Sequence, residues 1–199
     1  MVLPDTQRQN LTPQELQFLS SNELVKIKAR SSMKRISLVG RSVSPLKVMM
    51  DIEVPLWIAL ILKEQDKCNL IPPPWLNWSN LNRVYKEEVH NKYRFSQLPW
   101  NWQEVALTFL RFAPDDIDEP ISRLFSILQD LKEIRKVKAQ RGLKELNESN
   151  IQLNGLSSME IGELKPFVVQ VMDELRLLHG ASNEAILQEN SDEEVEARD

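Results

Sequence analysis

The sequence predicts a mainly helical fold in which a helical domain follows a small, strand-rich α+β domain. Before residue 71, apolar and basic residues alternate with a period of two, as in strands with one exposed face. From residue 79 onward, apolar residues recur with the helical period of 3.6. The prolines at 72–74 separate the two patterns, because proline has no N–H to donate. We therefore expect a disordered N-terminus (1–11), an α+β domain (12–71), a Pro/Trp-rich junction (72–78), a helical domain (79–182) and an acidic disordered tail (183–199).

The α+β domain is expected to begin with a short helix. Thr12 and Glu15 have the spacing of a capping box, and Pro13 occupies the first helical position, where its missing N–H is tolerated. Apolar and basic residues then alternate over 24–29, which predicts a strand with a basic exposed face. Further strands are expected at 35–39 and 46–50.

The apolar segment 53–63 is too short to span a bilayer, which takes about 20 apolar residues. It predicts a buried helix with Pro55 in the first turn, followed by a short strand that ends at Ile71. The tryptophans and prolines around this segment are predicted to pack at the domain junction. They are Trp57, Pro72, Pro73, Pro74 and Trp75.

Four helices are expected beyond the junction, at about 79–95, 99–112, 118–146 and 157–180. Pro99 and Pro120 suit first-turn positions. Ser157 and Glu160 form a second capping box, and Gly180 favours a helix end.

The composition argues against an enzyme and against a bound cofactor, metal or small-molecule ligand. The chain has five glycines and lacks the P-loop, G-x-S-x-G and H-E-x-x-H motifs. Its one cysteine cannot form an internal disulfide, and Cys68, His90 and His179 lack the spacing of metal ligands. The carboxylates within 115–119 could serve acid–base catalysis or bind a cation, but they also precede a long helix, whose dipole favours negative charge. We prefer this structural interpretation.

Charge is unevenly distributed along the chain. The first fifty residues carry eight Lys or Arg against three acidic residues, whereas 189–199 carry six acidic residues against one arginine. Two basic stretches, Lys26–Arg35 and Lys132–Lys144, leave nucleic-acid binding open as an alternative function, although solvated protein faces look the same. The candidate contacts with DNA or an acidic partner are Lys26, Lys28, Lys136 and Arg141.

The apolar surface of the predicted helices exceeds what four helices can bury against one another. A surplus of this kind, rimmed by charge, is typical of a protein interface. The longest helix is the preferred subunit contact. The candidate interface residues are Trp100, Trp102, Phe109, Leu124, Phe125, Leu128 and Leu131.

Four sequence blocks, in order, resemble the GINS family of eukaryotic replication proteins, and within it the second Psf subunit type, in a fungal-like form. The blocks are FLSSNELV at 18–25, EVPLWIALILK at 53–63 with CNLIPPPWL at 68–76, LPW at 98–100 with APDDI at 113–117, and LSSMEI at 156–161. The similarity covers about residues 14–180. Trp78, Trp102 and the acidic tail are not features that we carry over from the family.

The resemblance implies a small strand-rich B domain followed by a helical A domain, in the order read from the residue patterns. It also implies a nuclear, non-catalytic scaffold that associates with three paralogous GINS subunits. That heterotetramer joins the Mcm ring and a RecJ-like cofactor in the CMG replicative helicase, which acts in initiation and elongation of chromosomal DNA replication.

Overall fold

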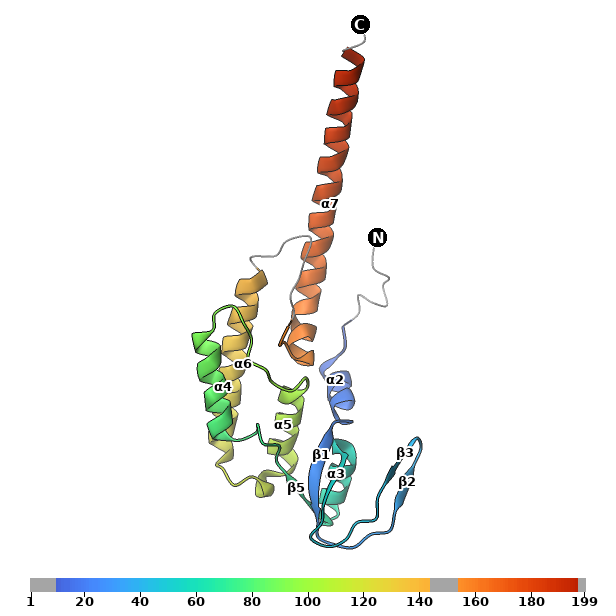
Figure 1. Ribbon diagram of the computed structural model, residues 1–199, viewed down its shortest axis with the longest axis vertical. Helices are drawn as coiled ribbons and strands as arrows, with labels where there is room; N and C mark the ends of the chain where they lie inside the picture. Colours follow the sequence, from blue (N-terminus) through green and yellow to red (C-terminus); the bar gives the residue numbers. More distant parts are fainter. Residues whose placement is uncertain (1–9, 144–153, 197–199) are drawn as a thin grey trace.

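The computed structural model describes residues 10–143 and 154–196, and it is mainly helical with a small N-terminal sheet region (Figure 1). The N-terminal part comprises α2 (Pro13–Ser20), β1 (Leu24–Ala29), β2 (Ile36–Leu38), β3 (Arg41–Val43), β4 (Asp51–Pro55), α3 (Leu56–Glu64) and β5 (Cys68–Ile71). The helical part comprises α4 (Trp78–His90), α5 (Trp102–Phe112), the 3-10 turn η1 (Pro114–Asp116), α6 (Ile121–Leu143) and α7 (Ser158–Glu196). The predicted fold class is confirmed.

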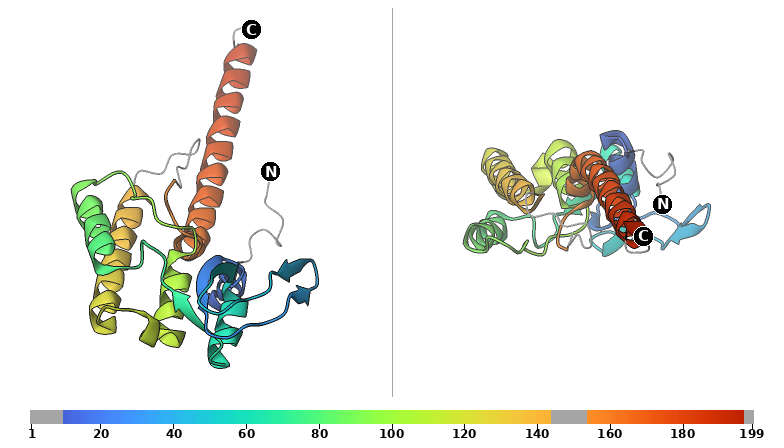
Figure 2. Two further views of the ribbon diagram at one scale, coloured as in Figure 1. Left: turned by 60° about the horizontal axis from the view of Figure 1, so that its bottom comes forward. Right: turned by 90° about the horizontal axis from the view of Figure 1, so that it is seen from above.

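The main sheet is antiparallel, with β1 between β4 and β5. Its central strand alternates as predicted, since Val25, Ile27 and Ala29 are buried while the lysines between them are exposed. The hairpin of β2 and β3 lies apart from this sheet, as the two views in Figure 2 show. Gly40 adopts a positive φ of 78° in its turn, a conformation that glycine accepts without strain.

Two predictions for this region were wrong. Residues 46–50 do not form the predicted strand: Leu46 makes an isolated bridge to Met33, and residues 48 and 49 form a turn in which Met49 has a φ of 64°. The next strand, β4, begins only at Asp51. The helix consequently begins at Leu56, with Pro55 as its N-cap. β4 is an edge strand, which tolerates a proline because one side of the strand needs no ladder bonds.

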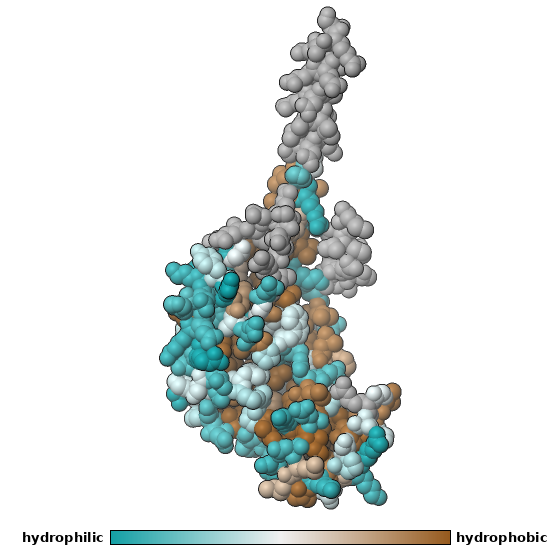
Figure 3. Space-filling model, in the orientation of Figure 1, coloured by the Kyte–Doolittle hydropathy of each residue, from teal (hydrophilic) through white to brown (hydrophobic). Residues whose placement is uncertain are grey.

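The helix α4 runs beside α6, and its exposed side is strongly hydrophilic (Figure 3). It begins at Trp78, one residue before the predicted start at 79. Its N-cap is Asn77, whose side chain accepts from the Asn80 N–H. The Glu119 carboxylate accepts from the Trp78 N–H at 2.8 Å and so binds another free N–H of the first turn. The guanidinium of Arg123 lies 3.8 Å from the centre of the Trp78 ring.

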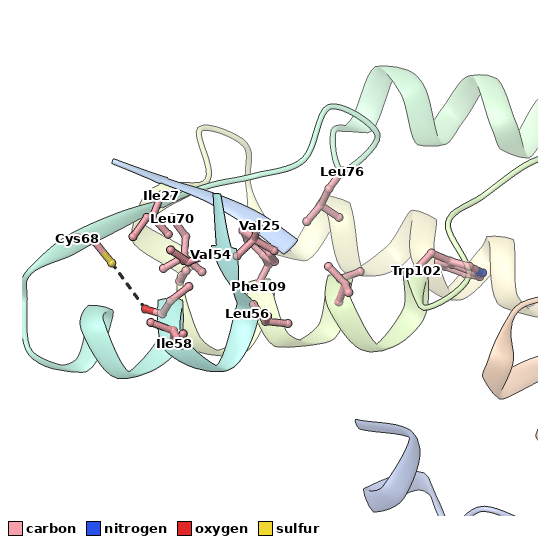
Figure 4. Packing of buried hydrophobic residues seen from close by; sticks show 14 of the residues in the cluster. Val25, Ile27, Val54, Leu56, Ile58, Cys68, Leu70, Leu76, Trp102 and Phe109 are labelled. Carbon is pink, nitrogen blue, oxygen red and sulfur yellow. Dashed lines mark hydrogen bonds between the residues drawn. The ribbon is translucent and has the colours of Figure 1, made fainter. Parts of the chain in front are cut away.

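One hydrophobic core runs through both parts of the chain. Figure 4 shows Ile27, Val54 and Leu70 of the sheet packed near Phe109 of α5, with Leu76 between the two parts. A polar contact reinforces this junction, because the Asp116 carboxylate accepts from Lys63 Nζ at 2.8 Å and from the Leu70 N–H at 2.7 Å. The sheet and the helices are therefore packed as one body.

The longest helix is α7, with 39 residues. It begins with the predicted capping box, since Ser157 N–H donates to Glu160 Oε2 and Glu160 N–H donates to Ser157 Oγ. The helix continues through Gly180 to Glu196, so the predicted helix end at Gly180 is wrong. Residues 183–196 are helical where a disordered tail was expected. A single glycine costs a helix only about 1 kcal/mol, and the alanine and glutamate residues that follow favour helix. Most of the predicted disordered N-terminus, residues 1–9, lies outside the described residues.

A buried cluster of charges joins α4, α6 and α7. The Arg135 guanidinium forms a bidentate pair with Glu160, with N–O distances of 2.7 and 2.9 Å, and donates to Glu88 Oε1 at 2.5 Å. Lys138 donates to the other oxygen of Glu88. Arg135 also donates to the carbonyl of Gly155, whose φ of 84° requires glycine. Two cations and two carboxylates thus neutralise one another inside the helical part.

Burial alone would raise the pKa of the Glu88 carboxyl. Hydrogen bonds from Lys138 and Ser96, together with the charge of Arg135, outweigh burial and hold this pKa below its ordinary value. The carboxylate of Glu88 therefore remains ionised in the folded chain.

Replacing Arg135 with alanine should lower the free energy of unfolding by about 3–5 kcal/mol, because Glu88 and Glu160 would remain buried without their cation. Urea unfolding followed by far-UV circular dichroism measures this loss. Arg141→Ala, at an exposed position of the same helix, is the matched control and should change stability by less than about 0.5 kcal/mol. Equal losses in the two variants would contradict the structural role of the cluster.

The folded chain should also lose stability as the pH falls below about 4.5, the ordinary pKa of a glutamate. The unfolded chain then takes up a proton that folded Glu88 resists, so acid favours unfolding. Urea unfolding at several pH values below this point should show a shallower pH dependence for Glu88→Gln than for the unaltered chain. Identical slopes would show that Glu88 does not contribute.

Candidate protein interface

The seven apolar residues predicted to contact a partner fall into two groups. Phe125 and Trp100 remain about half exposed, at 50% and 56%. The other five side chains are buried within the chain itself, where they pack its helices together. They are Trp102, Phe109, Leu124, Leu128 and Leu131.

The exposed side of α5 and α6 carries a groove of about 400 Å³, which we call the α5–α6 groove. Leu107 of α5, Phe125 of α6 and Met159 of α7 contribute apolar side chains to it. Leu107, at 49% exposure, is as open to solvent as Phe125. Large, half-exposed apolar side chains beside charged ones are typical of protein-binding surfaces. The polar lining consists of Gln103, Gln129, Lys132, Glu133 and Lys136.

Two neighbouring grooves extend this surface. The α2–α5 groove, of about 220 Å³, shares Leu107 and Met159 with the α5–α6 groove and adds Phe112. The α6–α7 groove, of about 810 Å³, shares two lysines with it and adds Leu164 and Phe167. Phe112 and Phe167 are also substantially exposed. The three grooves therefore form one continuous surface across α2, α5, α6 and α7.

Beyond its first turns, α7 projects away from the other elements (Figure 1). Its apolar residues recur at helical spacing through 164–178, and Leu177 and Leu178 are largely exposed. A helix with an apolar face needs a partner surface to bury it. The projecting part of α7 is thus a second candidate contact region.

Leu107 and Met159 were not predicted as interface residues. The apolar stripe of α5 consists of Trp102, Val105 and Phe109, and these side chains are buried in the core. Leu107 lies on the opposite side of this amphipathic helix, outside the stripe. A large apolar residue on the otherwise polar side is the sequence feature that indicates an exposed contact there. Met159 comes from a segment 52 positions later in the sequence, and only the fold brings it beside Leu107.

Three of the six basic residues in the stretch Lys132–Lys144 are paired with carboxylates. Arg135 and Lys138 are buried with carboxylates, and Lys132 pairs with Glu163 at 3.0 Å. Lys136 and Arg141 are exposed, and Lys144 lies outside the described residues. This distribution weakens the nucleic-acid interpretation, which needs clustered, accessible cations.

The basic face of β1 has acidic neighbours too. Lys26 Nζ lies 4.0 Å from a carboxylate oxygen of Glu53, and Lys28 is the register partner of Asp51. Such exposed pairs contribute little to stability, but they lower the positive charge that a phosphate backbone would meet. This face therefore gives nucleic-acid binding no stronger support.

The acidic segment before α6 has structural contacts. Asp116 binds Lys63 and the β5 backbone, and Glu119 binds the first turn of α4. The Cys68 thiol is buried, and burial, with the nearby Asp116 carboxylate, raises its pKa to about 11, so it is not a reactive thiolate. Among the described residues, His, Cys, Asp and Glu form no group of three that could hold a metal ion.

The residues predicted to pack at the junction lie where the sheet meets the helices. Trp57 and Trp75 are partly buried against the core, Pro72 and Pro73 are partly buried, and Pro74 is exposed.

None of the described helices combines the length and the hydropathy that crossing a membrane requires.

Comparison with known proteins gives a consistent result for both parts of the chain. Residues 12–71 match the family model for the PSF2 N-terminal domain, and 75–179 match that for the GINS complex protein helical bundle domain. Relatives named DNA replication complex GINS protein PSF2 occur in several fungi. The chain is 48% identical over its full length to that of Candida albicans, covering 98% of it. It is 52% identical over 92% of its length to that of Debaryomyces hansenii, covering 89% of it.

The protein of that name from Saccharomyces cerevisiae is 40% identical, with 98% of this chain and 99% of the relative covered. The similarity thus extends over the sheet region, the junction and the helical part. On these matches, the chain belongs to the GINS family of DNA replication proteins, in its PSF2 branch.

Proposed function

We propose that this chain is a non-catalytic scaffold subunit of a heterotetrameric GINS complex in the nucleus. In this proposal the complex joins the Mcm ring and a RecJ-like cofactor in the CMG replicative helicase, for initiation and elongation of chromosomal replication. Its relatives are named as GINS proteins of the DNA replication complex, which supports the replication role. The observation that carries the scaffold role is the set of half-exposed apolar side chains around the α5–α6 groove.

Burial of these side chains supplies a driving force for assembly. Fully burying a Leu or Phe side chain is worth about 1.5–3 kcal/mol. Leu107, Phe125 and Phe112 lie on adjoining grooves, so one partner helix can cover several of them at once. We place another GINS subunit on this surface, with its apolar side chains on Leu107 and Phe125.

The alternative functions receive less support from the same residues. An acid–base catalyst needs carboxylates that reach a substrate, whereas Asp116 and Glu119 are bound to the chain's own donors. A nucleic-acid-binding face needs free cations, whereas three of the basic residues on α6 are paired with carboxylates.

Leu107→Glu and Phe125→Glu should each weaken assembly with the other three GINS subunits by about 30-fold or more, as expected for a central interface residue worth about 2 kcal/mol. The four chains are co-expressed, and native mass spectrometry at decreasing concentration measures the fraction of the 1:1:1:1 particle.

Val89→Glu is the matched control, because Val89 is an equally exposed apolar residue on α4, away from the three grooves. This variant should assemble normally. Circular dichroism of each variant distinguishes lost contact from unfolding. Normal assembly of both groove variants would rule out this surface as the subunit contact.

A further inference from the structure

The first turn of α5 contains three consecutive side chains with buried, unpaired polar atoms. They are Trp102 Nε1, Gln103 Nε2 and Glu104 Oε2. The three residues are 1%, 5% and 5% exposed, so bulk water does not satisfy these atoms. The one further atom of this kind among the described residues is Asn69 Oδ1, in β5. Buried polar groups are normally hydrogen-bonded, so three successive exceptions call for a physical explanation.

Among the described residues, no cation donates a hydrogen bond to Glu104, and Lys132 is the one cation whose charge acts on it from a distance. The other carboxylate oxygen of Glu104, Oε1, accepts from Ser158 Oγ at 3.1 Å. On α6, Lys132 is paired with Glu163, and Arg135 belongs to the buried cluster. Arg111 lies two helical turns further along α5 and lines the α2–α5 groove, as Glu104 does. Its guanidinium lies over the Phe112 ring. Glu104 Oε2 therefore lies at the lining of the α2–α5 groove without a hydrogen-bond partner.

These atoms lie at the grooves described above. Trp102 and Gln103 line the α5–α6 groove, and Glu104 lines the α2–α5 groove. Leu107 and Met159 belong to both grooves, so all three polar side chains border one apolar surface. In Figure 4 the ring nitrogen of Trp102 points away from the aliphatic side chains of the core.

We propose that the partner subunit covering the two grooves inserts one Arg or Lys side chain that donates to Glu104 Oε2, next to apolar side chains that cover Leu107. This inference rests on the proposed function and specifies the partner's chemistry. An oxygen of the same segment, from a backbone carbonyl or a side chain, accepts from Gln103 Nε2. The buried polar atoms then supply specificity, because an apolar segment without these groups would leave them unpaired.

The protonation of Glu104 agrees with this arrangement. Burial raises the pKa of its carboxyl. Hydrogen bonds from its own backbone N–H and from Ser158, together with the charge of Lys132, offset this increase only in part. A cation from the partner would stabilise the ionised form and remove this penalty. The carboxylate therefore destabilises the free chain and contributes to the complex.

The test is Glu104→Gln in the full chain, co-expressed with the other three subunits. Glutamine keeps an oxygen for Ser158 but replaces the negative charge with an amide. Assembly, measured by native mass spectrometry on dilution, should weaken by about 30-fold or more, because the partner's charge loses its counterion. The isolated chain should resist urea at least as well as the unaltered chain, because a buried unpaired charge has been removed. Glu87→Gln, which removes the same charge from α4, should leave assembly unchanged.

The outcomes distinguish this inference from the proposed interface. If Leu107→Glu abolishes assembly and Glu104→Gln does not weaken it, the inference is overturned while the interface stands, and water satisfies Glu104. If neither variant weakens assembly, this surface is not the contact at all. If Glu104→Gln weakens the isolated chain as much as the assembly, Glu104 has a structural role within the chain, which also overturns the inference.

Discussion

The buried guanidinium of Arg135 fixes the arrangement of the helical part of this protein. It binds Glu88 of α4 and Glu160 of α7 from its own position on α6, and it also binds the loop carbonyl of Gly155. Removing two carboxylates from water is costly, and the planar fork of arginine compensates for this with bidentate geometry. Glu160 also caps the first turn of α7, so the residue that starts this helix holds it against α6. The direction in which α7 leaves the body follows from this contact.

The same helix shows why the exposed apolar residues matter. The side chains of α6 that face inward, Leu124 and Leu131, are fully buried, while Phe125 points into the α5–α6 groove. The inward-facing apolar residues thus pack against other parts of the same chain. The outward-facing Phe125 has no comparable packing partner among the described residues. The half-exposed aromatic residue is therefore attributed to assembly with another chain. In the proposed scaffold, folding of the subunit and its assembly would depend on different faces of one helix.

Sequence periodicity predicted most of the elements, because helices and strands each impose a local pattern. The alternation over β1 and the two capping boxes identified their elements directly. β4 was missed because its last residues directly precede an apolar helix. The strand and the helix together resemble one continuous apolar segment in the sequence. The candidate site was less predictable, because it depends on contacts between distant segments. Arg135 and Lys138 looked like part of a solvated basic face, and no local pattern indicates that Glu88, 47 residues before Arg135, would lie against them. Exposure of Leu107 likewise depends on which face of α5 the core takes.

The length of α7 provides an independent argument for a partner. With 39 residues, the helix is about 58 Å long. Near its start it packs against α2, where Leu16 lies beside Gly162. Isolated helices are marginal in water, and most helical stability in proteins comes from packing of an apolar face. The exposed Phe167, Leu177 and Leu178 carry such a face beyond the reach of α2. A partner helix along this face would supply the missing packing, and together with the grooves at its base it would give the scaffold one extended contact rather than two separate ones.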